Sequence, residues 1–130
     1  MSEKSLFAKF SSGCLSFPGS LVDFEILNWN AHPSFKGVAL KHLVTAKESG
    51  GRFSYHLVKI EPGCEIGLHV HETQLESHEV IEGQGTALNN GEEVVYSPGI
   101  ISIFEPNTSH KVSAGADGLR LFAKFFPPLC

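Results

Sequence analysis

Apolar residues recur along most of the chain in short runs, and Gly, Pro and Asn separate one run from the next. Runs of this length, bounded in this way, are typical of strands in a β-sandwich or barrel. We expect strands at residues 22–29, 37–45, 52–61, 65–71, 78–82, 86–88, 92–96, 100–104 and 119–126. Residues 39–47 could also be drawn as a helix, but their Val and Thr content favours a strand. The pattern therefore predicts one all-β domain.

Several predicted turns have a direct physical basis. Residues 89–91 (Asn-Asn-Gly) separate two strand-like runs, and Asn-Gly supplies the positive φ that a tight hairpin turn needs. Residues 62–63 (Pro-Gly) and 97–99 (Ser-Pro-Gly) are turn formers in which proline also removes a ladder donor.

The two ends of the chain read differently from its middle. Small residues and proline interrupt residues 1–20, which we expect to form an extended arm, free to pack on a partner subunit rather than on its own barrel. The barrel domain is then residues 21–130. The apolar tail at 125–130 is expected to pack against the barrel or a second subunit, because it would favour aggregation if exposed.

The composition excludes some classes of partner. With 130 residues, of which 42% are hydrophobic and 18% charged, the chain can bury a real core. Ten Lys and Arg against 14 Asp and Glu give a net charge of −4. This charge argues against nucleic acid and anionic membranes as partners, since both require a concentrated positive field. Three scattered cysteines and no visible export signal predict reduced thiols and a cytoplasmic protein.

The residues with metal chemistry concentrate in the middle of the chain. His69 and His71 are two residues apart in a predicted strand, so both imidazoles project from one face with Cα atoms roughly 6.6 Å apart. From this separation they can converge on one ion, and Glu76 can bring a carboxylate to the same point. The donor set suits Fe, Mn, Ni, Zn or Cu without choosing among them. A His-x-His pair by itself is weak support for a metal site.

The residues around this pair resemble the first conserved motif of the cupin superfamily, G-x5-HxH-x4-E-x6-G. Its five positions correspond here to Gly63, His69, His71, Glu76 and Gly83.

A second stretch resembles the family's second motif, G-x5-P-x-G-x2-H-x3-N. Gly99 and His110 stand at the matching positions. Glu105, Asn107 and Ala114 replace the proline, the second glycine and the asparagine. Asn107 is a mild change, because Asn tolerates the left-handed conformation. None of these departures falls on a ligand position.

The resemblance implies a fold, a cofactor and an assembly. The implied fold is a double-stranded β-helix, also called a jelly-roll or cupin barrel, with one divalent transition-metal ion near one mouth. The implied ligands are His69, His71, Glu76 and His110. Small cupins are commonly homodimers, so a homodimer is also expected.

Other polar residues could act beside the metal. His78 follows the predicted glutamate ligand by two residues, so it should face the same interior and could be the catalytic acid or base. Its alternative role is purely structural. Gln74 could compete as an oxygen ligand and His56 could line the cavity, although both residues are more simply explained without a function. His32 and His42 are expected to be structural or exposed.

Four aromatic residues are candidates for cavity walls, although aromatic side chains in a small barrel usually belong to the core. They are Tyr55, Tyr96, Phe104 and Phe122. Cys64 is an odd number of residues from His69, so strand alternation places the two side chains on opposite faces. We therefore expect Cys64 to face away from the cavity and to be inert.

Two kinds of function remain open, because one metal shell supports many reactions. The first is a metal-dependent enzyme (oxygenase, isomerase, lyase or decarboxylase) that acts on a small organic acid or carbonyl compound. The alternative is a non-catalytic module that binds a small molecule such as a sugar or metabolite. A vestigial site is a third reading, against which the complete ligand set argues. An inward-facing His78 would favour an enzyme, whereas a cavity plugged by Phe would argue against one.

Overall fold

The computed structural model describes residues 4–130, which form mainly antiparallel strands. The strands are β1 (Cys14–Phe17), β2 (Ser20–Asp23), β3 (Asn30–Ala31), β4 (Val38–Val44), β5 (Ser54–Ile60), β6 (Glu65–Val70), β7 (Leu75–Asn89), β8 (Glu92–Tyr96), β9 (Ile101–Phe104) and β10 (Ser109–Phe126). The helices are α1 (Leu6–Ser11), the 3-10 helix η1 (Phe24–Ile26) and α2 (Ala46–Ser49). Within residues 4–130, every helix is too short to span a bilayer.

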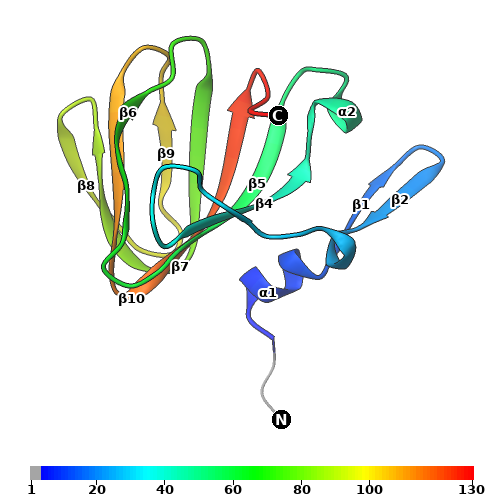
Figure 1. Cartoon of the computed structure of the whole chain (residues 1–130), viewed down its shortest axis with the longest axis horizontal. Coiled ribbons are helices and arrows are strands. Elements are labelled where there is room, and N and C mark those ends of the chain that lie inside the picture. Colours follow the sequence, from blue (N-terminus) through cyan, green and yellow to red (C-terminus); the bar gives the residue numbers. More distant parts are fainter. Residues whose placement is uncertain (1–3) are drawn as a thin grey trace.

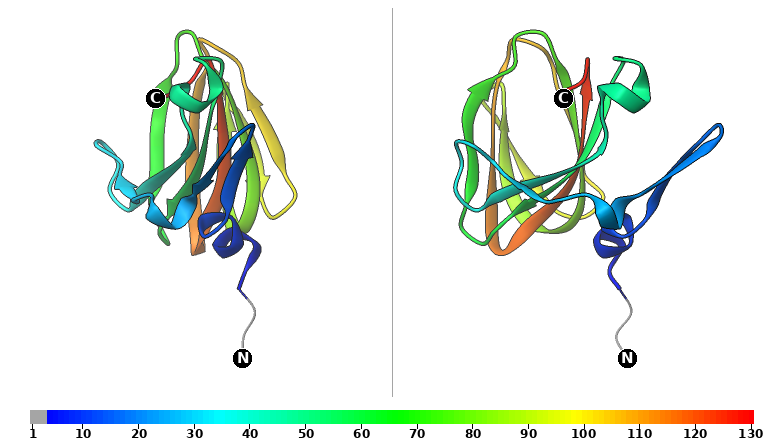
Figure 2. Two further views of the ribbon diagram at one scale, coloured as in Figure 1. Left: turned by 90° about the vertical axis from the view of Figure 1, so that its right-hand side faces the viewer. Right: turned by 45° about the vertical axis from the view of Figure 1, so that its right-hand side comes forward.

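Strands β3 to β10 form one hydrogen-bonded sheet that folds back on itself into two layers (Figures 1 and 2). One layer has the order β3-β4-β5-β10-β7-β9 and uses the second half of β10 and the first half of β7. The other layer has the order β6-β10-β7-β8 and uses the remaining halves. The two long strands therefore belong to both layers. This arrangement confirms the predicted double-stranded β-helix.

Strands β7 and β10 change layer where glycine lets their backbones approach closely. Gly83 has φ +86°, and a Cβ on this residue would lie 2.1 Å from the carbonyl oxygen of Gly118. A larger residue would be strained there and would also collide with the backbone. The separate strands predicted at 78–82 and 86–88 are therefore one strand that continues through the bend.

Three left-handed residues confirm expectations about the turns. Asn90 and Gly91 have φ of 50° and 85°, as both central residues of a type I′ hairpin turn require, and they join β7 to β8. Asn107 has φ of 63°, so it adopts the conformation for which glycine is normally selected. Its N–H donates to the carbonyl of His71 at 2.7 Å and so ties the two motif-bearing stretches together.

The N-terminal arm contains a helix and packs on the chain's own sheet. The Ser5 side chain caps α1 by accepting a hydrogen bond from the N–H of Ala8, and Phe7 is buried in an apolar cluster on the outer face of the barrel. The buried Lys41 amino group donates to the Ser11 carbonyl at 2.5 Å. The extended conformation expected for the arm is wrong for α1, because one capped helical segment can bury Phe7 on the chain's own barrel.

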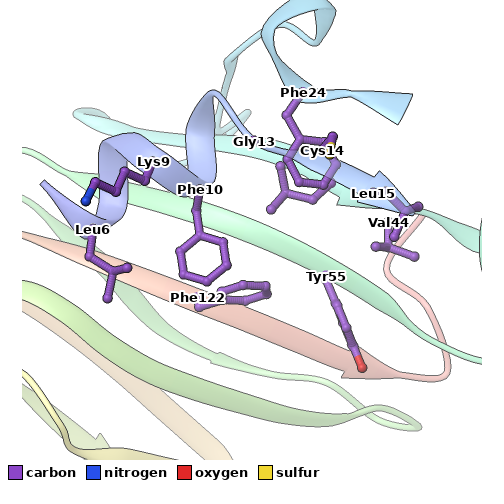
Figure 3. A pocket seen from close by; sticks show the side chains of 11 residues that line it. Leu6, Lys9, Phe10, Gly13, Cys14, Leu15, Phe24, Val44, Tyr55 and Phe122 are labelled. Carbon is purple, nitrogen blue, oxygen red and sulfur yellow. The ribbon is translucent and has the colours of Figure 1, made fainter. Parts of the chain in front are cut away.

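The rest of the arm is a hairpin and a 3-10 turn. Strands β1 and β2 pair with each other, and the Asp23 side chain then caps η1 by accepting from the N–H of Glu25. The strand predicted at 22–29 is therefore wrong beyond Asp23. A hollow of ≈ 380 Å³ lies between the arm and the outer face of the sheet (Figure 3). Tyr55 and Phe122 line this hollow, so they are not walls of an interior cavity.

The main core fills the space between the two layers. It includes Val58, Ile60, Tyr96, Phe104, Val112, Leu119 and Leu121. Tyr96 and Phe104 are almost completely buried in it, as expected for aromatic residues of a small barrel.

Candidate metal centre

Four side chains that are distant in the sequence meet inside the barrel. His69 lies on β6, His71 directly follows it, Glu76 lies on β7 and His110 on β10. His69 and His110 are register partners on neighbouring strands, and their ring centroids are 4.1 Å apart. The ring centroids of His71 and His110 are 5.4 Å apart. Together the four residues form a cluster that could hold a metal ion.

Several buried atoms of this cluster lack hydrogen-bond partners. The Oε1 oxygen of Glu76 lies 3.1 Å from Nε2 of His71 and 3.1 Å from Nε2 of His110. Yet among the described residues neither this oxygen nor either ring nitrogen of His110 makes a hydrogen bond of acceptable geometry. Buried polar atoms without partners are rare and costly. Two ligands about 2.1 Å from one ion and at a right angle would lie roughly 3 Å apart, so the observed spacing fits a metal ion as the missing partner.

Neighbouring groups fix the orientation of the imidazoles. The Nδ1–H of His69 donates to the carbonyl of Gly67 at 2.7 Å, which leaves Nε2 free for a metal. Phe104 stacks on His110 with the ring centroids 4.4 Å apart and the planes at 24°. The side chain of His71 keeps 24% of its surface exposed, so the cluster is accessible from its side.

The protonation states also suit metal binding. Burial would raise the pKa of Glu76, but His78, His110 and His71 outweigh it, and the pKa lies well below its ordinary value. Burial lowers the pKa of His69. An ionised carboxylate and a neutral imidazole are the forms that coordinate metals.

His78 points into the barrel, as expected, but its ring faces Glu76 rather than open space. Its Nε2 lies 2.5 Å from Oε2 of Glu76, and its Nδ1 lies 3.4 Å from the hydroxyl of Tyr96. Only 2% of the side chain is exposed. In this position His78 fixes the orientation of the Glu76 carboxylate. Residues that hydrogen-bond to metal ligands commonly have this role. Its role as a catalytic acid or base stays a prediction.

The cluster opens on an interior cavity of ≈ 290 Å³ with a largely apolar wall. Besides the cluster and His78, the wall consists of His32, Ser34, Phe35, Leu40, Val58, Ile66, Val112, Ala123, Phe125 and Leu129.

His32 is a cavity residue that sequence reasoning missed. It follows β3, in the connection to β4, and the expectation of a purely structural or exposed residue did not include a place in the cavity wall. Its Nδ1 accepts hydrogen bonds from the N–H groups of Ser34 at 3.0 Å and Phe35 at 3.3 Å, so Nε2 is the remaining ring nitrogen. Burial lowers its pKa. No local sequence signal marks it, because its place depends on how this connection folds over the barrel.

The C-terminal tail reaches the wall of the same cavity with Leu129, and the chain terminates at the end of the barrel that also carries α2 (Figures 1 and 2). The amide of Gln74 donates to the carbonyl of Pro128 at 2.9 Å, and the N–H of Leu129 donates to the hydroxyl of Ser54 at 2.8 Å. Gln74 thus binds the tail rather than the cluster, and Leu129 contributes to the cavity wall.

His56 lies behind the cavity rather than in its wall. Its Nδ1 is 2.7 Å from Nδ1 of His42, and its Nε2 is 2.7 Å from the hydroxyl of Ser54. The ring of Phe125 lies 5.5 Å from that of His56 and 5.5 Å from that of His71, so it separates this pair from the main cluster. Burial, followed by the charge of His42, lowers the pKa of His56 to about 3.

The metal-free protein should lose stability in mild acid because of His56. Its pKa falls from 6.5 to about 3 on folding, so below pH 6.5 the unfolded chain takes up a proton that the folded chain does not. Over that interval each such group lowers the free energy of unfolding by up to about 1.4 kcal/mol per pH unit. Urea unfolding at about pH 7 and about pH 5, with chelator present, measures the slope. We expect a shallower slope for His56→Gln; the same slope in both proteins would contradict the assignment.

Comparison with known proteins identifies sequence relatives. The family model of the cupin domain matches residues 56–123, just over half of the chain. L-ectoine synthase of Bordetella parapertussis is 32% identical over 88 residues, which cover 66% of this chain and 66% of that protein, slightly under two thirds of its length. The oxalate-binding protein of Thermotoga maritima is 31% identical over 55 residues, 42% of this chain and 46% of that protein.

Solved structures share the fold. A predicted oxalate decarboxylase from Thermotoga maritima superposes with a TM-score of 0.70 at 23% identity, covering 78% of this chain and 91% of that chain. Ectoine synthase from P. lautus superposes with a TM-score of 0.65 at 27% identity, covering 72% of this chain and 67% of that chain.

Proposed function

Because the chain belongs to the cupin superfamily, we propose that it is a metal-dependent enzyme acting on a small organic acid or carbonyl compound. The observation that carries the proposal is the set of buried, unpartnered atoms on Glu76 and His110 beside a cavity of ≈ 290 Å³. The proposed ligands are these two residues with His69 and His71, and the proposed ion is Fe, Mn, Ni, Zn or Cu in the divalent state. The reaction is that of an oxygenase, isomerase, lyase or decarboxylase.

The cavity suits a small substrate with oxygen donors. A bound ion would supply Lewis acidity and open positions for such donors. Among the described residues that line the cavity there is no Lys or Arg, so the ion would be the charge partner of a carboxylate substrate. One sequence relative, the oxalate-binding protein of Thermotoga maritima, carries oxalate, a small dicarboxylate, in its name, which supports a substrate of this class.

The chain's own residues would position the substrate and exclude water. Phe35, Phe125 and Leu129 belong to the apolar wall of the cavity, and expelling water strengthens the electrostatic interactions inside. His32 lines the cavity and its Nδ1 is occupied by two backbone N–H groups, so we assign it the transfer of a proton at the substrate through Nε2.

The alternative is a non-catalytic module that binds a small molecule, and one observation favours it. Although His78 borders the cavity, its Nε2 is engaged by Glu76 and only 2% of its side chain is exposed, so among the described lining residues outside the proposed ligands His32 is the other candidate acid–base group. A site with so few proton-transfer groups would be sufficient to bind a chelating acid without transforming it.

Metal analysis combined with a substrate screen tests the proposal. Protein purified without added metal is analysed for Fe, Mn, Ni, Zn and Cu, and then incubated with oxalate and other small carboxylates and carbonyl compounds. Oxygen uptake, carbon dioxide release and product NMR report turnover. Glu76→Gln removes the charged ligand at almost constant volume, and His32→Gln removes the proposed proton-transfer group.

We expect about one ion per chain at this centre and turnover of at least one compound, with both lost in Glu76→Gln. His32→Gln should keep the ion and lose activity. Metal-dependent ligand binding without turnover would favour the binding module over the enzyme. A protein in which Glu76→Gln leaves both the metal content and the ligand response unchanged would overturn the assignment of the centre.

A further inference from the structure

We propose that His42, His56 and Cys130 form a second metal site, separate from the cupin centre, for a thiophilic ion such as Zn²⁺. Each of the three side chains offers one ligand atom, and these atoms all lie within 4.8 Å of one another. Two imidazoles and one thiolate are the donors that zinc accepts in proteins.

The strand pairing directs both imidazoles to one point. His42 on β4 and His56 on β5 are direct register partners, and an irregularity in the pairing follows His42. Leu43 and Val44 consequently both pack in the outer apolar cluster, while His42 keeps its inward direction. The two Nδ1 atoms then lie 2.7 Å apart, and this spacing must open by roughly 0.6 Å to fit two nitrogens on one tetrahedral ion.

The hydrogen bonds around His56 allow the exchange of a proton for a metal. Ser54 accepts from the N–H of Leu129, and among the described residues its hydroxyl has only Nε2 of His56 to donate to. When the Ser54 hydroxyl donates to Nε2, His56 carries its proton on Nδ1 and donates it to Nδ1 of His42. When an ion binds to the two Nδ1 atoms, this proton moves to Nε2 of His56. The Nε2–H group can then donate a hydrogen bond to the Ser54 oxygen, as the second ring nitrogen of a metal-binding histidine usually does.

The tail supplies the third donor. The N–H of Ala46, at the start of α2, donates to the carbonyl of Cys130 at 2.7 Å and holds the residue beside the two histidines. Burial and the charge of Glu48 raise the pKa of the Cys130 thiol. A bound cation reverses this effect, so binding releases the thiol proton to solvent and forms one metal–sulfur bond. No change in oxidation state is required.

The two sites differ in ligand chemistry as well as in position. Phe125 stands between them, 5.5 Å from the rings of both His56 and His71. The cupin cluster offers only nitrogen and oxygen donors, whereas the second site offers sulfur, which selects softer ions. A sulfur–metal signal therefore reports the second site alone.

Cobalt titration followed by absorption spectroscopy tests the proposal, with Co²⁺ as the probe for Zn²⁺. The near-ultraviolet sulfur-to-cobalt charge-transfer band reports thiolate ligation. We expect the wild-type protein to show this band and to bind two ions, and Zn²⁺ to remove the band on competition. Cys130→Ser, at an exposed residue, should bind one ion without the band. His42→Gln should weaken binding at this site at least tenfold.

Matched controls separate this site from the rest of the protein. Cys64→Ser changes a thiol that packs against Gly37, away from both clusters, and should keep the band. His69→Gln should keep the band while losing the ion of the cupin centre, so a failure of that centre would not remove the signal. Absence of the band in wild-type protein, or its persistence in Cys130→Ser, would overturn the second site.

Discussion

Replacing His110 by alanine should lower the affinity of the cupin centre for its metal by more than about 100-fold. Loss of a residue that only hydrogen-bonds to a metal ligand costs up to about 100-fold, and loss of a ligand itself should cost more. His110 is 2% exposed, and its Nε2 lies 3.1 Å from Oε1 of Glu76, an oxygen that makes no hydrogen bond. Its removal leaves three donors and an open position in the interior. Titration against a chelating indicator measures the affinity, and circular dichroism of the metal-free variant shows whether the barrel remains folded.

A matched substitution in the same cavity should have almost no effect on this affinity. His32→Gln also changes a cavity histidine, but one outside the cluster of potential ligands. We expect it to bind the metal within about twofold of wild type, far below the loss expected for a ligand. Equal affinities for wild type, His32→Gln and His110→Ala would contradict the ligand assignment.

Gly83→Ala should destabilise the barrel by about 2–5 kcal/mol. The residue has φ +86°, and the added Cβ would meet the Gly118 carbonyl oxygen at 2.1 Å. The left-handed conformation costs an L-residue about 1–2 kcal/mol, and forced overlap with a packed neighbour costs about 1–3 kcal/mol more. Urea unfolding of wild type and variant at neutral pH measures the difference in the free energy of unfolding.

Gly63→Ala is the control for backbone strain alone. Gly63 has a similar φ of +73°, but nothing lies within 4 Å of the added Cβ. We expect a loss of about 1–2 kcal/mol, without the collision. If the two variants lost the same stability, the close approach of β7 and β10 at the bend would not be the reason for glycine at position 83.

The cluster could be predicted from the sequence in two steps. Strand alternation places His69 and His71 on one face with Glu76 shortly after them, whereas His110 was expected only from the resemblance to the second cupin motif. The surroundings of the cluster could not be predicted in the same way. Alternation gave the inward direction of His78, but not that its Nε2 would be engaged by Glu76.

The fold was predictable where turn residues and apolar runs mark the ends and the lengths of the strands. Turn residues located the hairpin at Asn90 and Gly91, and apolar runs located most strands. The continuous path of β7 through Gly83 was missed, because a glycine within an apolar pattern also reads as a strand end. The α1 helix was missed because its formation depends on burying Phe7 against a distant sheet. The homodimer and the cytoplasmic location remain predictions.

The path of β10 has a consequence for the order of folding. Residues 109–126 pair with β5, β6 and β7, so they supply an inner strand to each layer. During synthesis the earlier strands can form only partial pairings until this segment has left the ribosome. Closure then requires contacts between residues far apart along the chain, which makes the conformational search slow relative to that of a helical domain of similar length.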